Sequence, residues 1–263
     1  MTPIQQMPAK EISRIQILFT DIDDTLSRHG RIPAAAYNAL WQAHEAGLRV
    51  IPVTGRPAGW CDHIARMWPV DAVVGENGAL AYAMQTQSKG APPALSRLYA
   101  DRPPDAQERL DAIEKQILQE IPGAKVASDQ AYREYDLAID FCEEVTALPK
   151  HQVTRIKEIF EENGATAKIS SIHVNGWFGE FDKLSMCKRA YAHFFEEELD
   201  PGSAVFVGDS PNDEPMFQFF PTSVGVANVI EFANQMTALP TYVTTEPGGN
   251  GFAEFMDVLL KNR

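Results

Sequence analysis

Two acidic side chains follow an apolar run near the start of the chain. The run Ile15–Thr20 predicts a buried strand, and Asp21 and Asp23 come just past its end. Like charges this close repel each other, and a hard cation is the usual means of neutralising them. A carboxylate can also attack phosphorus, so we predict Asp21 as a nucleophile and Asp23 as an acid/base. The alternative is an Asp-rich turn that only ends the strand.

A second group of acids follows a second apolar run. Ala204–Val207 predicts a strand, and Gly208-Asp209-Ser210-Pro211-Asn212-Asp213 comes next. We expect Asp209 to bind a metal, Asp213 to hold a metal-bound water or orient a lysine, and Asn212 to contact phosphate. Mg²⁺ fits best, because it binds a few carboxylates and accepts phosphate oxygen. The metal-binding candidates are therefore Asp21, Asp23, Asp209 and Asp213. The alternative is a capping turn.

The segment Thr54-Gly55-Arg56 ends a third apolar run, Leu48–Thr54. A hydroxyl group and a backbone N–H at a strand end can bind phosphoryl oxygens, and glycine lets the chain come close to them. We therefore predict Thr54, Gly55 and Arg56 as substrate-binding residues. A Thr-Gly turn is, however, common in any α/β protein.

Lys183 begins a predicted helix over Lys183–Glu198. A cation at a helix N-terminus opposes the helix dipole, so an anion nearby would account for its position. We expect Lys183 to neutralise Asp21 and a transferring phosphoryl group, while Asp182 caps the helix. The alternative is a solvated surface lysine.

The composition indicates a globular protein that acts on small molecules. The chain has 263 residues, 44% of them hydrophobic, enough for one large or two modest domains. Its formal net charge of -13 disfavours nucleic acid or an anionic membrane as a partner, because both attract clustered Lys and Arg. Cys61, Cys142 and Cys187 lack metal-type spacing, and no segment is typical of export. We therefore predict reduced thiols and a cytoplasmic location.

Both ends of the chain alternate strands with helices. We predict helices over Pro33–Ala46 and Ala58–Met67, and strands over Asp71–Gly75, Ser223–Val226 and Thr241–Thr244. This order is typical of a parallel sheet, whose ligands bind outside the carboxyl ends of the strands.

The middle of the chain lacks this strict alternation. It contains predicted helices over Asp105–Glu120 and Pro149–Asn163 and apolar runs at Leu137–Phe141 and Thr166–Val174. We interpret residues 82–181 as an inserted α+β domain, with residues 1–81 and 182–263 forming one core. A cleft between two such parts is a favoured place for a small ligand.

Taken in their order along the chain, the four segments that carry candidate catalytic and binding residues resemble the haloacid dehalogenase superfamily of phosphohydrolases. Its pattern is Asp-x-Asp-x-Thr, then Ser or Thr, then Lys, then Gly-Asp-x-x-x-Asp, and this chain has Asp21–Thr25, Thr54, Lys183 and Gly208–Asp213. The insert after Thr54-Gly55-Arg56 and Glu76-Asn77-Gly78 is similar to the type IIB cap subclass, which includes sugar-phosphate phosphatases and phosphomannomutases. The resemblance implies an α/β fold, with a Rossmann-like parallel-sheet core and an inserted α+β cap domain.

The resemblance also implies roles for the matching residues. Asp21 is the nucleophile, Asp23 is the acid/base and gives a backbone carbonyl to Mg²⁺, and Asp209 completes the metal site. Thr54 and Lys183 bind phosphate. Phosphoryl transfer to Asp21 is followed by hydrolysis with water that Asp23 activates.

Residues of the insert should select the substrate. Arg133, His173 and Asn175 have side chains that can reach a sugar or a second anionic group, and Trp177 can stack on a sugar. The alternative for Trp177 and His173 is a role in packing.

We therefore predict a Mg²⁺-dependent phosphatase of a small phosphorylated metabolite, a sugar phosphate, with no nucleic-acid or membrane partner, present as a monomer or homodimer. One alternative is a phosphomutase, which returns the phosphoryl group to an organic acceptor. Another is a phosphoacceptor signalling protein that resembles a response-regulator receiver. Such a domain is about half this length, and Asp23 and the large insert favour turnover.

Overall fold

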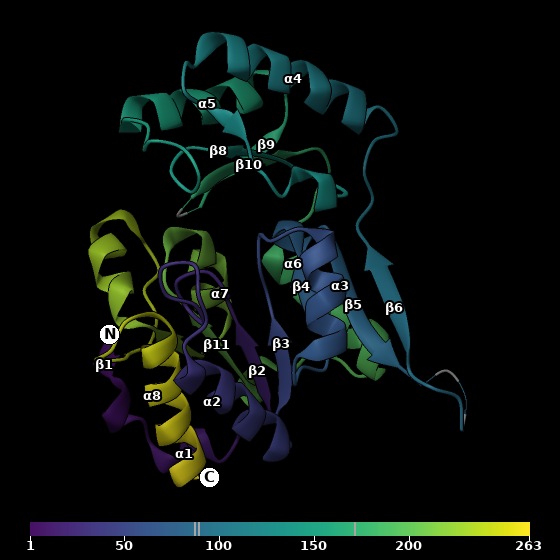
Figure 1. The fold of residues 1–263 in the computed structure, drawn as a ribbon. Coiled ribbons are helices and arrows are strands. Elements are labelled where there is room, and N and C mark those ends of the chain that lie inside the picture. Colours follow the sequence, from purple (N-terminus) through teal and green to yellow (C-terminus); the bar gives the residue numbers. More distant parts are fainter. Residues whose placement is uncertain (87, 89, 171) are drawn as a thin grey trace.

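A six-stranded parallel sheet forms the centre of the structure (Figure 1), a computed structural model that describes residues 1–86, 88, 90–170 and 172–263. In spatial order its strands are β1 (Thr2–Pro3), β13 (Tyr242–Val243), β12 (Thr222–Gly225), β11 (Ala204–Gly208), β2 (Ile17–Thr20) and β3 (Arg49–Pro52). Both ends of the chain contribute strands to it, as the alternating order predicts. The predicted parallel sheet is therefore confirmed.

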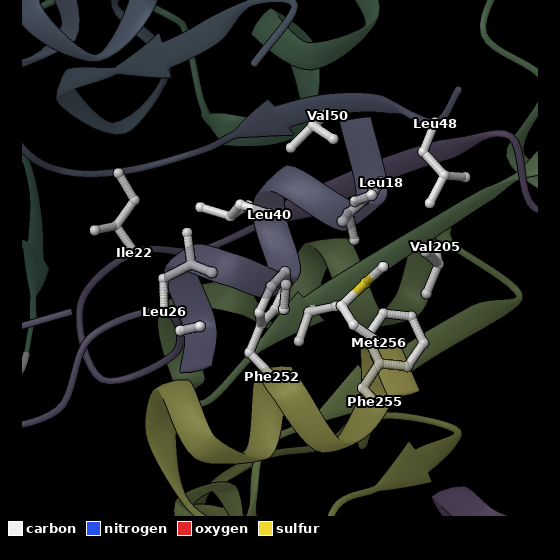
Figure 2. Packing of buried hydrophobic residues seen from close by; sticks show 14 of the residues in the cluster. Leu18, Ile22, Leu26, Leu40, Leu48, Val50, Val205, Phe252, Phe255 and Met256 are labelled. Carbon is white, nitrogen blue, oxygen red and sulfur yellow. The ribbon is translucent and has the colours of Figure 1, made fainter. Parts of the chain in front are cut away.

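Helices cover both faces of this sheet because its strands are buried on both sides. Leu18 faces the helices α2 (Ala34–Glu45), α3 (Ala58–Met67) and α8 (Gly248–Lys261), whereas Phe19 faces α6 (Lys183–Phe195) and α7 (Glu214–Phe219). Figure 2 shows Phe252, Phe255 and Met256 of α8 directed toward the first face of the sheet. A short helix, α1 (Ala9–Ile12), precedes β2.

The predicted helices match the observed ones closely, with one early ending. The helix predicted over Lys183–Glu198 ends at Phe195, because Glu196 adopts a left-handed conformation with φ 56°. Gly47 has φ +79° after α2, as expected of a glycine that ends a helix. Every helix among the described residues is too short or too polar to cross a membrane.

The residues from 101 to 180, which we call the insert, form a separate layer above the core in Figure 1. Its antiparallel sheet has the order β7 (Lys125–Val126), β8 (Leu137–Asp140), β10 (His173–Trp177) and β9 (Thr166–Ile169). The helices α4 (Ala106–Glu120) and α5 (Lys150–Glu162) pack on one face of it. The predicted apolar run over residues 166–174 is two antiparallel strands, and Ser171 within it lies outside the described residues.

A three-stranded antiparallel sheet joins the insert to the core. It consists of β4 (Val73–Gly75), β5 (Leu80–Gln85) and β6 (Ala94–Tyr99), of which only β4 was predicted from the sequence. Ala81 and Ala83 of β5 pack in the same hydrophobic cluster as Phe19 of the core. The predicted boundaries of the inserted domain, residues 82 and 181, stay a prediction.

Candidate active site

The carboxyl ends of three neighbouring strands bring the predicted residues together. β2 pairs with β11 on one side and with β3 on the other, so Asp21, Asp209 and Thr54 follow adjacent strands. The backbone N–H of Asp21 continues the pairing by donating to the carbonyl of Val207 at 2.9 Å. The parallel register thus places these three side chains at one edge of the sheet.

Lys183 forms two buried ion pairs at the start of α6. Its Nζ lies 2.7 Å from Asp21 Oδ1 and 2.8 Å from Asp213 Oδ1. Burial alone lowers the pKa of Lys183, but the two carboxylates outweigh it and raise that pKa. The predicted contact with Asp21 is present, and Asp182 caps the helix by accepting from the Ser185 N–H at 2.7 Å. The alternative of a solvated lysine is therefore wrong.

Gly78 allows α6 to begin close to the segment that follows β4. It has φ +104°, and a Cβ atom there would lie 2.1 Å from the carbonyl oxygen of Asp182. Any other residue would therefore displace the helix start and with it Lys183.

Three buried carboxylates lie close enough together to bind one metal ion. One oxygen from each of Asp21, Asp209 and Asp213 lies within 4.8 Å of the others. Burial raises the pKa of Asp21 to about 8, although Lys183 lowers it, and burial also raises the pKa of Asp209 well above its ordinary value. Three carboxylates beside one lysine leave excess negative charge, and hard oxygen ligands of this kind fit Mg²⁺.

The carboxylate of Asp209 is oriented by two side chains from other segments. Thr25 Oγ1 donates to its Oδ1 at 3.2 Å, and Asn228 Nδ2 donates to its Oδ2 at 2.9 Å. Asn228 was not predicted from the sequence. Its only signal is its place just after the strand that ends at Gly225, where other site residues of this sheet also lie.

The side chain of Asp23 is turned toward Arg56. Arg56 Nε lies 3.1 Å from both carboxylate oxygens, and its Nη2 lies 2.8 Å from Oδ1. The same Nη2 also contacts Glu143 of the insert at 3.2 Å, and the guanidinium stacks on the ring of Trp60 at 4.5 Å. Asp23 is not part of the group of three carboxylates, so its roles in metal binding and proton transfer stay predictions.

Thr54 and Gly55 lie with Arg56 in the loop that follows β3, and both form hydrogen bonds there. Thr54 is fully buried, and its Oγ1 accepts a hydrogen bond from the Arg56 N–H at 3.0 Å. The carbonyl of Gly55 accepts from Arg133 Nη1 at 3.0 Å. These bonds fix the loop at the end of β3, while phosphate binding by these residues stays a prediction.

A cavity between the core and the insert contains most of the predicted residues. It is lined by Asp21, Asp23, Gly55, Arg56, Asn77, Arg133, Ser170, Ile172, His173, Asn175, Ser210 and Asn212. Four other lining residues were not predicted from the sequence: Asn77, Ser170, Ile172 and Ser210. Each of them lies within or beside a predicted motif or apolar run, so proximity along the chain is the available signal.

Two acidic residues of the insert neutralise the charge of Arg133. Arg133 is 1% exposed at its side chain and contacts Asp129 at 3.2 Å and Asp136 at 2.9 Å. Asn175 Nδ2 donates to Asp136 Oδ2 at 2.8 Å. In this conformation Arg133 is thus engaged by the protein itself.

His173 and Trp177 both lie on β10 and are buried. His173 Nε2 lies 2.8 Å from Glu143 Oε2 and lines the cavity. Trp177 instead stacks on Phe181, with ring centroids 5.6 Å apart, within the hydrophobic cluster of the core. The packing alternative therefore holds for Trp177.

The charged form of Glu143 should stabilise the folded protein, so its contribution should depend on pH. Its bond with His173, and then the charge of Arg56, lower its pKa from 4.5 to about 2. A lowered pKa gives stabilisation that is present above about pH 4.5 and lost as pH falls toward 2. Because solvent reaches this carboxylate, we expect Glu143→Gln to cost only about 1 kcal/mol at neutral pH.

Urea unfolding of both proteins at about pH 7 and about pH 3 measures this effect. We expect the difference in the free energy of unfolding to shrink at the lower pH. An equal difference at both pH values would contradict this origin of the stabilisation.

Comparison with known proteins agrees with this arrangement. Residues 18–91 match the family profile described as haloacid dehalogenase-like hydrolase. A solved structure of the Thermoplasma acidophilum protein 0175 has a TM-score of 0.72 at 17% identity, covering 94% of this chain and 98% of that one. The chain has the haloacid dehalogenase fold. The predicted family resemblance and fold class are thereby confirmed.

Two further solved structures are similar to this chain along nearly their whole length. A subclass IIB sugar phosphatase has a TM-score of 0.63 at 16% identity, with 92% of this chain and 98% of that one covered. The sucrose-phosphatase from Synechocystis sp. PCC6803, solved with sucrose and phosphate, has a TM-score of 0.61 at 15% identity, with 93% and 98% covered. No curated protein sequence matches the chain. The similar structures show the fold, and the matching profile describes a hydrolase, which agrees with the prediction of an enzyme.

Proposed function

We propose that the protein is a Mg²⁺-dependent phosphatase that hydrolyses a sugar phosphate through an aspartyl-phosphate on Asp21. The observation that carries this proposal is the contact of Asp21 with Lys183, beside Asp209 and Asp213, at a cavity between the core and the insert. The choice of a sugar phosphate rests on the similar sugar phosphatases and on the polar side chains that line the cavity.

In the first step, Asp21 attacks the phosphorus atom of the substrate. A bond forms between a carboxylate oxygen and phosphorus, and the bond from phosphorus to the sugar oxygen breaks. Asp23 gives a proton to that leaving oxygen. Lys183 stabilises the negative charge of the phosphoryl group, since its ammonium group already lies 2.7 Å from Asp21.

In the second step, water hydrolyses the aspartyl-phosphate. Asp23, now ionised, removes a proton from the water as it attacks phosphorus, which restores Asp21 and releases inorganic phosphate. Asp21, Asp209 and Asp213 would hold the cation, with Asp23 adding its backbone carbonyl. When bound, Mg²⁺ supplies positive charge that offsets the buried carboxylates and polarises a phosphoryl oxygen.

A panel of sugar phosphates, assayed with Mg²⁺ and with a chelator, tests this function. We expect release of inorganic phosphate from at least one sugar phosphate, with Mg²⁺ required. Isomerisation of a sugar phosphate without phosphate release would instead identify a phosphomutase. A long-lived adduct with acetyl phosphate and no turnover would indicate a signalling protein.

Mg²⁺ should also raise the thermal stability of the protein. A ligand at a concentration 100 times its Kd adds about 2.7 kcal/mol, which corresponds to a shift in Tm of at least about 5 °C. We expect Asp209→Asn to lose most of this shift, because it removes a charged ligand. The exposed Asp257 on α8, which pairs with Lys261, provides a control through Asp257→Asn. Equal shifts in the wild type and Asp209→Asn, measured by differential scanning fluorimetry, would place the cation elsewhere.

A further inference from the structure

Glu76 is a buried acid that the proposed mechanism does not use. It follows β4, is 0% exposed and has a left-handed backbone with φ 43°. Its carboxylate accepts from the backbone N–H of Ala58 at 2.9 Å, Glu134 at 2.9 Å, Tyr135 at 2.7 Å and Asp136 at 3.1 Å. One of these donors belongs to the core and three consecutive donors belong to the insert, so one side chain fastens the two parts together.

The backbone beside this side chain holds the predicted phosphate-binding loop. The N–H of Glu76 donates to the carbonyl of Arg56 at 3.1 Å, and the N–H of Asn77 donates to the carbonyl of Thr54 at 3.1 Å. The side-chain bond to Ala58 adds a third connection just after this loop. Residues 76 and 77 thus hold the loop at the end of β3 through three hydrogen bonds.

The insert segment bound by Glu76 carries one wall of the cavity. Arg133 precedes the three donors and donates to the Gly55 carbonyl at 3.0 Å. Asp136, the last of the three, accepts from Asn175 Nδ2 at 2.8 Å. Arg133 and Asn175 both line the cavity. The bonds to Glu76 therefore help to determine where this wall lies relative to Arg56, which also lines the cavity.

A carboxylate suits these four donors better than an amide of the same shape. An ionised carboxylate only accepts hydrogen bonds, whereas a glutamine would direct its NH₂ group at backbone N–H donors. At least one pair of buried donors would then lose its acceptor, which is costly in a water-free site. The arrangement thus requires an acidic side chain of this length.

We propose that Glu76 is a positioning residue that fastens residues 134–136 of the insert to the loop Thr54–Arg56 and so sets the shape of the substrate cavity. The assignment of the cavity to a sugar phosphate rests on the proposed function, whereas the fastening itself does not. Glu76 touches no reacting atom, so its effect should fall on recognition of the sugar and not on the chemistry at Asp21.

Kinetics of Glu76→Gln test the effect on recognition. Burial, and then the charge of Asp136, raise the pKa of Glu76 to about 7, so the comparison is made at about pH 8.5, where the carboxylate is ionised. We expect KM for the best sugar phosphate to rise at least about tenfold, with kcat within about threefold of wild type. For p-nitrophenyl phosphate, which has no sugar to recognise, we expect kcat/KM within about threefold.

Glu134→Gln is the matched control. It removes a negative charge from the same insert segment, but the carboxylate of Glu134 accepts from the Tyr82 hydroxyl, at 3.2 Å, and not from the four backbone donors that Glu76 binds. We expect its KM to stay within about threefold of wild type. An equal rise in KM in both variants would overturn the proposed positioning role. An equal loss of kcat/KM for the sugar phosphate and for p-nitrophenyl phosphate in Glu76→Gln would also overturn it.

Hydrogen exchange tests the fastening without any variant and without any activity. Residues 134–136 lie outside the strands and helices, so their amides would exchange quickly unless Glu76 accepts their hydrogen bonds. We expect the wild-type amides of residues 134–136 to be protected as strongly as those of β8. Rapid exchange in the wild type would overturn the proposal, even if the protein proves to be a phosphatase. Strong protection would support it, even if no sugar phosphate is hydrolysed.

Discussion

Asp21→Asn should reduce the turnover of a sugar phosphate by at least about 10³-fold, because an amide oxygen cannot serve as the nucleophile. The side chain is placed by two fixed elements, the end of β2 and the ammonium group of Lys183 at 2.7 Å. Asn has nearly the same shape as Asp and keeps an oxygen that accepts from Lys183. The loss should therefore report the missing nucleophile and not a displaced lysine.

The stability of this variant provides an internal check. Burial raises the pKa of Asp21 to about 8, which shows that its charge is unfavourable where it lies. A neutral Asn removes that charge from beside Asp209 and Asp213, so Tm in the absence of Mg²⁺ should stay equal or rise. A large fall in Tm would instead mean that lost activity reflects lost structure.

Covalent labelling identifies the intermediate directly. The substrate is a sugar phosphate with a radiolabelled phosphoryl group. Acid quench of the wild type during turnover should trap this label on the protein, whereas Asp21→Asn should trap none. Asp257→Asn should behave like the wild type, because that acid is exposed on α8. Normal phosphate release by Asp21→Asn would refute the proposed nucleophile.

The parts of the site that lie at strand ends could be predicted because a local pattern marks each of them. A short apolar run followed by a polar group occurs at Asp21, Thr54 and Asp209, and parallel pairing then places such positions at one edge. The run and the polar group are adjacent in sequence. No long-range information is needed to expect them to meet.

The ion pairs across the cavity could not be predicted in this way. Arg56 contacts Glu143, and the two residues are separated by 87 positions in the sequence. The three donors that bind Glu76 are about 60 positions away from it. Such contacts depend on how the insert packs on the core, and neither hydrophobic periodicity nor a turn motif records that packing.

The sequence marks the boundary of the insert weakly for a different reason. β5 has apolar residues on both faces, with Ala81 and Ala83 packed on the core, so its pattern does not distinguish a strand from other buried segments. Its partner β6 is partly exposed, and its apolar residues are interrupted by Ser96 and Arg97. The sequence does not show the antiparallel pairing of β5 with β6. The alternation of strands and helices can therefore be recognised only as far as β4, which is why the predicted insert starts soon afterwards, at residue 82.

Lys183→Met should impair both turnover and stability. The ammonium group is the direct ion-pair partner of Asp21 and Asp213, and all three side chains are buried. Removing one partner of a buried ion pair costs about 3–5 kcal/mol, because the remaining charges lose their compensation. Turnover should fall about 10²–10³-fold, since the phosphoryl group loses the same positive charge.

Urea unfolding with a chelator and with Mg²⁺ separates this electrostatic effect from a loss of packing. Methionine fills a similar volume, so a packing defect would persist in both conditions. If charge is the cause, Mg²⁺ should recover part of the lost stability, because it neutralises the same carboxylates. Lys261→Met is the control, since Lys261 pairs with Asp257 at the surface.

The pH dependence should point to the same cause. The unpaired carboxylates can bind protons at lower pH, and their raised pKa values mean that stability is lost as pH increases. In the presence of a chelator, the difference in stability between wild type and Lys183→Met should therefore be larger at about pH 9 than at about pH 6. A difference that is independent of both pH and Mg²⁺ would show that Lys183 acts through packing and not as the counter-charge of the active site.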